Sequence, residues 1–116
     1  MNRFLVIDQD RTMMHDLGLG CLERGVGVAF AETVCEGVRE LLSDSVSLVV
    51  VDAALLHLGA RESATLFERV APGVAVVVVV RPDSPLESRV ALELAGFTVV
   101  VRPVAADDLL KVVEVA

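Results

Sequence analysis

Acidic side chains directly follow two apolar segments of the chain. Asp8 and Asp10 come after residues 4–7, and Asp52 comes after residues 48–51. A carboxylate beside a buried strand is costly unless it meets a cation or hydrogen-bond donors. Clustered carboxylates suit a hard divalent cation such as Mg²⁺. We therefore expect Asp8 and Asp52 to share one polar site.

The alternative is that each of these aspartates caps the helix that follows it. We favour this capping role for Asp10, which comes just before a predicted helix. For Asp52 we favour a functional role, because residues 53–56 start no obvious helix.

The segments that must position these side chains read as five buried β-strands. They are Arg3–Ile7, Val26–Phe30, Ser47–Val51, Val74–Val80 and Thr98–Val101. All but the first are rich in valine, a β-branched residue that favours strands. They do not alternate between polar and apolar residues, which is typical of strands buried on both faces of a parallel sheet.

A helical pattern follows each strand. The predicted helices are Arg11–Arg24, Glu32–Leu42, Glu62–Val70, one that begins with the capping box Ser84-Pro85-Leu86-Glu87, and one that begins near Asp107-Asp108. Their inner faces are predicted as Met14, Leu17, Cys21 and Leu22; Val34, Val38, Leu41 and Leu42; Leu66, Phe67 and Val70; Val90, Ala91 and Leu94; Leu109, Leu110 and Val113. Alternating strands and helices predict a doubly wound α/β sandwich. In a flavodoxin-like strand order, 2-1-3-4-5, Asp8 and Asp52 end neighbouring strands at the ligand-binding edge.

Length and composition narrow the function classes. A chain of 116 residues forms one domain, residues 1–116, and the last helix reaches its end, so it could be excised from a longer protein. A net charge of −7 without Trp or Tyr argues against a nucleic-acid partner. The longest apolar run, residues 74–80, is far shorter than the about 20 residues that span a membrane. We expect a cytoplasmic protein without a membrane partner.

The other metal-ligating residue types carry no recognisable site. Cys21 and Cys35 lack CxxC spacing, and each lies on the apolar stripe of a predicted helix, so we expect small core residues. His15 is expected on a helix surface and His57 in the loop after Asp52, neither with a neighbour at metal-binding spacing.

Taken in order, these segments resemble the receiver domain of two-component response regulators. The matching pieces span the chain: residues 4–10, 48–52, 95–96, 101–103 and 107–110. In that family an acidic pair after the first strand holds Mg²⁺, and an Asp after the third accepts a phosphoryl group from a histidine kinase. A Ser or Thr after the fourth strand and a Lys after the fifth contact that group. A Pro follows the Lys, usually after a cis peptide bond.

The resemblance implies an atypical site. Asp52 matches the phosphoacceptor, and Asp8, Gln9 and Asp52 match the Mg²⁺ ligands, with Gln9 where a second carboxylate belongs. Arg102 replaces the lysine and Arg81 lies near the hydroxyl position, so both become candidates to contact the phosphoryl group. A glutamine carbonyl can still ligate but lacks the charge that a hard cation prefers. The Mg²⁺ and phosphoryl sites are therefore expected to be weakened.

In that family, the hydroxyl after the fourth strand moves toward the phosphoryl group, and an aromatic ring on the fifth strand follows it. This chain has neither group at those positions. Either Val80 or Arg81 stands where the family has a hydroxyl, and residues 98–101 contain no aromatic residue. A receiver domain is not itself a metabolic enzyme, so we predict a signalling domain. Its implied partners are a histidine kinase or phosphotransfer protein, an output domain or partner protein, and a second copy through the face of the fourth helix, fifth strand and fifth helix.

Two alternatives remain open on sequence grounds. The first is a pseudo-receiver, a protein-interaction module that acts without phosphorylation. The second is a haloacid dehalogenase-like phosphatase, because Asp8–Thr12 fits a DxDxT pattern in which the first Asp is the nucleophile and the second the general acid. The chain is small for that family, and it lacks a Ser or Thr at the end of the fourth strand.

Overall fold

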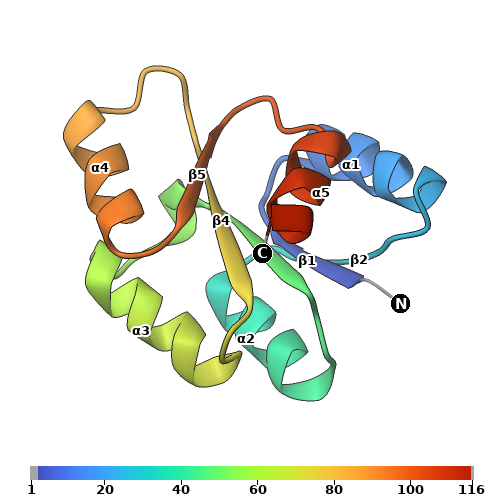
Figure 1. The fold of residues 1–116 in the computed structure, drawn as a ribbon, viewed down its shortest axis with the longest axis horizontal. Coiled ribbons are helices and arrows are strands. Elements are labelled where there is room, and N and C mark those ends of the chain that lie inside the picture. The colour runs from blue at the N-terminus through green and yellow to red at the C-terminus, as the bar shows by residue number, and fades with distance from the viewer. Residues whose placement is uncertain (1–2, 116) are drawn as a thin grey trace.

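The structure, a computed structural model, describes residues 3–115 and contains one parallel sheet. Its strands are β1 (Arg3–Ile7), β2 (Gly27–Ala31), β3 (Leu48–Asp52), β4 (Ala75–Val80) and β5 (Thr98–Val101). They are ordered β2-β1-β3-β4-β5 and every pair is parallel (Figure 1). The predicted strand order is therefore confirmed, and each predicted strand lies within one or two residues of an observed one.

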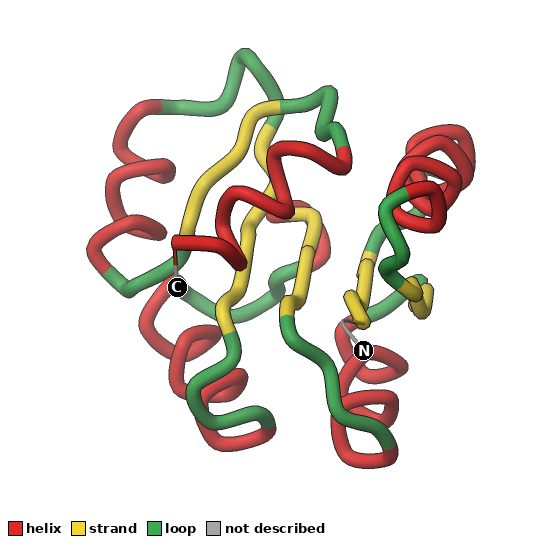
Figure 2. Tube along the Cα trace, turned by 45° about the vertical axis from the view of Figure 1, so that its right-hand side comes forward, coloured by secondary structure: helices red, strands yellow, loops and turns green. Residues whose placement is uncertain are grey.

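In residues 3–115, five α-helices enclose this sheet in two layers. They are α1 (Arg11–Glu23), α2 (Val34–Ser43), α3 (Ala60–Val70), α4 (Leu86–Leu94) and α5 (Ala106–Val115); one 3₁₀ turn, η1 (Ala53–Leu55), follows β3. Helices α1 and α5 cover one face, and α2, α3 and α4 cover the other (Figures 1 and 2). Within the described residues, no helix is both long enough and apolar enough to cross a bilayer.

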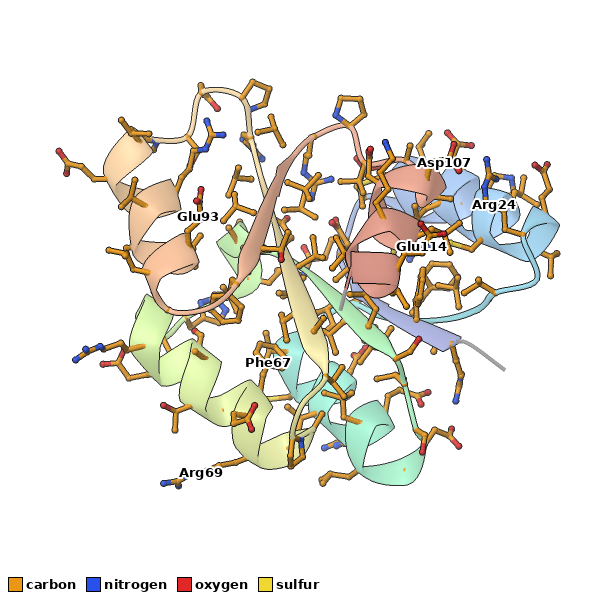
Figure 3. The ribbon with its side chains drawn as sticks, viewed as in Figure 1. Arg24, Phe67, Arg69, Glu93, Asp107 and Glu114 are labelled. Carbon is orange, nitrogen blue, oxygen red and sulfur yellow. The ribbon has the colours of Figure 1, made fainter. Side chains whose placement is uncertain are left out.

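The strands divide their side chains between two apolar cores. Phe4 and Val6 of β1 pack under α1 and α5, while Leu5 and Ile7 pack under α2 and α3, and all four are fully buried. Burial on both faces explains why the strand sequences are apolar throughout rather than alternating. The surface adds an ion pair between α1 and α5, in which Arg24 Nε lies 2.7 Å from Asp107 Oδ1 (Figure 3).

Several predicted helix faces are wrong, most clearly in α4. Val90 and Leu94 are exposed and Leu92 is the buried residue, because α4 packs beside the edge strand β5 and only one row of its side chains is covered. Ala91 is also exposed, as are Leu22 of α1 and Leu42 of α2. Exposed Leu86, Val90 and Leu94 recur every four residues, and we call them the α4 stripe.

The predicted capping box is also absent from α4. The helix begins at Leu86, and its N-cap is Pro85, which has an extended backbone and makes no side-chain capping hydrogen bond. Ser84 therefore lies outside the helix rather than at its cap. The cause is backbone geometry, since Pro85 has the ψ of an extended residue rather than of a first helical turn.

The two cysteines differ sharply in exposure. Cys21 is buried as expected, but Cys35 is exposed, so its predicted core position is wrong. Burial raises the pKa of the Cys21 thiol, and the nearby Arg24 charge offsets only part of this rise. A thiol reagent reacts with the thiolate, which must also be reachable. The two thiols should therefore differ in reactivity.

We expect one thiol per native chain to react quickly with Ellman's reagent, and the second only in denaturant. Cys35→Ser should remove the fast phase, and Cys21→Ser should leave it intact. Fast reaction of two thiols in the native protein, or of one thiol in Cys35→Ser, would contradict the burial of Cys21.

Candidate functional site

Three charged side chains meet at the carboxyl edge of the sheet. Asp8 follows β1, Asp52 ends β3 and Arg102 follows β5. Strands β1 and β3 are neighbours, whereas β4 separates β3 from β5. The long arginine side chain therefore reaches across the end of β4 to the two carboxylates. This edge is where open α/β sheets place their ligands.

Asp8 is a buried carboxylate with a complete set of donors. Only 1% of its surface is exposed. Its Oδ1 accepts hydrogen bonds from the backbone N–H groups of Gln9 and Asp10, at 2.8 and 2.9 Å. Its Oδ2 accepts one from Arg102 Nη2 at 2.6 Å. Charged donors and backbone N–H groups together offset the cost of burying this carboxylate.

Asp52 caps a turn with one carboxylate oxygen and faces Arg102 with the other. Its Oδ1 accepts a hydrogen bond from the Ala54 N–H at 3.0 Å and so caps the η1 turn. Its Oδ2 lies 3.1 Å from Arg102 Nη2, and 21% of the side chain is exposed. The expectation that no helix starts after Asp52 is therefore wrong, because one short 3₁₀ turn begins there. One oxygen holds the backbone while the other faces the charged site.

Arg102 contacts all three aspartates of the site. Its Nη2 contacts both Asp8 and Asp52, and its Nη1 lies 3.7 Å from Asp10 Oδ2 and donates a hydrogen bond to Met13 Sδ at 2.9 Å. Burial alone would lower the pKa of the guanidinium, but the hydrogen bond to Asp8 and the charges of Asp8, Asp52 and Asp10 outweigh it, so the pKa is raised. The side chain, 18% exposed, stays charged between three carboxylates.

The peptide bond that follows this arginine, Arg102–Pro103, is cis. The resemblance to receiver domains implies a proline at this position, usually with that geometry.

The remaining predicted site residues lie at the margin. Asp10 caps α1 by accepting a hydrogen bond from the Met13 N–H, as predicted. The Gln9 side-chain amide donates to the Glu32 carbonyl at 3.1 Å, outside the cluster of carboxylates. Arg81 is exposed after β4 and makes no ion pair with any residue in the range 3–115. The structure thus unites Asp8, Asp52 and Arg102, but neither Gln9 nor Arg81 joins them.

The two histidines lie where the sequence placed them. His15 is exposed on α1, and His57 is exposed in the loop after η1. Across the described residues, no three His, Cys, Asp or Glu side chains are grouped so as to hold a metal ion.

Sequence reasoning missed the contacts of the arginine. Met13 was read only as part of a helix, yet its sulfur contacts the guanidinium. The backbone donors to Asp8 and Asp52 were also missed. Only Asp10 could have indicated the position of Met13 from the sequence. Asp10 is the N-cap of α1 and accepts a hydrogen bond from the Met13 N–H, so Met13 lies in the first turn after β1.

The arrangement does not fit a divalent cation as it stands. Both oxygens of Asp8 and both oxygens of Asp52 already have partners. The two oxygens that face each other share one nitrogen of Arg102, so a metal ion could bind them only after displacing a guanidinium. The Gln9 amide points to Glu32 rather than to these oxygens.

Comparison with known proteins gives the same fold and a recognisable sequence likeness. No family model matches the chain. It is 27% identical over 110 residues to the transcriptional regulatory protein GlrR of Escherichia coli K12, covering 95% of this chain but only 25% of that protein. It thus spans about a quarter of that relative's length.

Solved structures extend this likeness. A CheY-like response regulator receiver domain from Methanospirillum hungatei superposes with a TM-score of 0.80 at 23% identity, over 98% of this chain and 91% of that one. A response regulator from Burkholderia pseudomallei, solved with a phosphorylated aspartic acid, a calcium ion and citrate, gives 0.80 at 19% identity, over 95% and 65%. The predicted resemblance to receiver domains of two-component response regulators is confirmed, and the chain has their fold.

Proposed function

We propose that the domain receives a signal at Asp52, as the phosphoacceptor of a two-component system. The observation that carries this is the position of Asp52 at the end of β3, with one carboxylate oxygen beside a cationic guanidinium. In the reaction, that oxygen attacks the phosphorus of a phosphohistidine, the P–N bond breaks, and the histidine leaves with the bond's electron pair. Arg102 neutralises the negative charge that arrives with the phosphoryl oxygens.

The proposed donor is a histidine kinase or a phosphotransfer protein, and the proposed receiver of the signal is an output domain or a separate protein in the cytoplasm. We further propose that the Mg²⁺ site of the domain is weak or absent, because Gln9 supplies no charge and the facing oxygens of Asp8 and Asp52 already contact Arg102. No catalytic turnover is assigned to the chain. Asp10, which a phosphatase of the haloacid dehalogenase type would use as general acid, caps α1 instead.

A second function, binding without phosphorylation, is favoured by the α4 stripe. Leu86, Val90 and Leu94 are exposed next to β5. Exposed apolar residues gathered on one face are typical of interaction surfaces. Val80 is buried in the core and β5 carries no aromatic side chain. The hydroxyl and the aromatic ring that would relay a change from the phosphoryl site to this face are therefore both missing. We propose that this face binds a partner or a second copy constitutively.

Beryllofluoride, which mimics a phosphoryl group on aspartate, tests the two functions together. In NMR spectra recorded with and without Mg²⁺, we expect shifts at Asp8, Asp52 and Arg102 and little change in α4 or β5. Asp52→Asn removes the oxygen that would bind and is expected to abolish every shift. Large shifts across α4 and β5 would show a working switch. No shift at all in the wild-type domain would refute Asp52 as the acceptor.

A further inference from the structure

The guanidinium of Arg102 lies where the acidic cluster converges. Its Nη2 is 2.6 Å from Asp8 Oδ2 and 3.1 Å from Asp52 Oδ2, so one nitrogen bridges two carboxylates from neighbouring strands. Its Nη1 lies 3.7 Å from Asp10 Oδ2. A single positive group thus faces three negative ones, which is the electrostatic role that a bound cation has in a cluster of carboxylates.

Two further contacts hold this arginine in place. Its backbone N–H donates to the Val80 carbonyl at 2.9 Å, which fixes the start of the side chain at the end of β4. At the other end of the side chain, Nη1 donates to Met13 Sδ. The Arg102 side chain is therefore held at both its backbone end and its guanidinium end, and little of it is exposed to solvent.

Asp8 depends on this arginine more than Asp52 does. Asp8 is almost fully buried, so it can exchange Arg102 for another cation only if that cation enters the same space. A divalent ion and a guanidinium cannot both contact Asp8 Oδ2 and Asp52 Oδ2, because the two positive groups would repel each other at short range. Arginine remains charged at every pH at which the domain is folded.

We propose that Arg102 is the resident cation of this site and takes the place of a divalent metal ion. The native domain is then insensitive to Mg²⁺, and removal of the guanidinium converts the same carboxylates into a metal site. The inference concerns the cation alone, and it holds whether or not Asp52 accepts a phosphoryl group. A failed test of this inference would therefore leave the proposed phosphoacceptor role of Asp52 intact, and a failed test of that role would leave this inference intact.

The experiment compares the wild-type domain with Arg102→Met, which keeps an unbranched apolar side chain but removes the charge. The first readout is the urea midpoint with and without Mg²⁺. We expect no Mg²⁺ effect in the wild type. Arg102→Met should unfold at lower urea without metal and regain stability with Mg²⁺, with an affinity at least about tenfold tighter than that of the wild type. Arg69→Met, an exposed arginine at the far end of α3, is the matched control and should behave as the wild type (Figure 3).

The second readout is made first on the wild type and then on Arg102→Met. Mn²⁺ broadens the NMR signals of nuclei near its binding site, and we expect the amide signals of Gln9, Asp10 and Ala53 in the wild type to stay sharp. Broadening of those signals at the same Mn²⁺ level in the wild type and in Arg102→Met would overturn the proposal. So would an Arg102→Met domain that folds yet binds no metal. If that variant does not fold, the wild-type measurement decides alone: broadening overturns the proposal and its absence supports it.

The double variant Gln9→Asp/Arg102→Met refines the result. An added carboxylate at position 9 should tighten metal binding once the guanidinium is gone, and Gln9→Asp alone should gain little. A large gain from Gln9→Asp in the presence of Arg102 would show that the arginine leaves the metal position open, and would overturn the proposal.

Discussion

Replacing Asp8 with alanine should lower the free energy of unfolding by about 3–5 kcal/mol, the cost of breaking a buried ion pair from one side. The change leaves the N–H groups of Gln9 and Asp10 without their acceptor and removes the closest partner of Arg102. Two unpaired donors and a poorly solvated guanidinium all favour the unfolded chain. Chemical denaturation followed by circular dichroism measures the loss.

Two further substitutions separate charge from hydrogen bonding. Asp8→Asn retains an oxygen for the two backbone N–H groups but not the negative charge, so it should fall between the wild type and Asp8→Ala. Asp16→Ala, on the exposed face of α1, should stay within about 0.5 kcal/mol of the wild type. If Asp8→Ala were as stable as Asp16→Ala, the buried pair would contribute nothing to the fold. If Asp8→Ala does not fold, Asp8→Asn still gives a measurable value.

Phe67→Ala is the second large effect, at about 3–5 kcal/mol. The Phe67 side chain is 2% exposed and forms part of the core beneath α2, α3 and α4. Its ring meets Phe97 edge to face, with centroids 6.4 Å apart at an angle of 85°. Removing the ring leaves a cavity between α3 and the sheet, which neighbouring side chains fill only in part.

Phe30→Ala provides a control of the same residue type. Phe30 lies on the edge strand β2, and 46% of its side chain is exposed, so its loss should cost about 1 kcal/mol. Both variants are measured by urea denaturation, with the slope of the transition checked for two-state behaviour. Equal losses for the two phenylalanines would contradict the difference in burial that the structure gives them.

The fold could be predicted from the sequence because its central strands are buried on both faces. Residues 48–51 and 75–80 carry long apolar runs that only a sheet between two helical layers can accommodate. The helix faces were predicted less well where a helix lies at the edge of that sheet. In α4 the pattern contains apolar residues on several sides, and nothing local indicates that Leu92 rather than Val90 meets the core.

The site was predicted as a location but not as a network. The positions of Asp8 and Asp52 follow from strand order, since each comes directly after a buried run. That Arg102 reaches over β4 to bridge them depends on the register of three strands, which no local pattern records. The same holds for Gln9, whose amide bonds to the backbone of Glu32 in a segment more than twenty residues away.

The valine run of β4 has a consequence for the unfolded chain. Residues 74–80 form a continuous apolar stretch without charge, proline or glycine, a composition that readily stacks into cross-β fibrils. In the native sheet the strand is shielded, because β3 and β5 occupy both of its hydrogen-bonding sides. Once the domain opens, that shield is gone and intermolecular pairing competes with refolding. The stretch that specifies the middle of the sheet is therefore also an aggregation hazard when the domain unfolds.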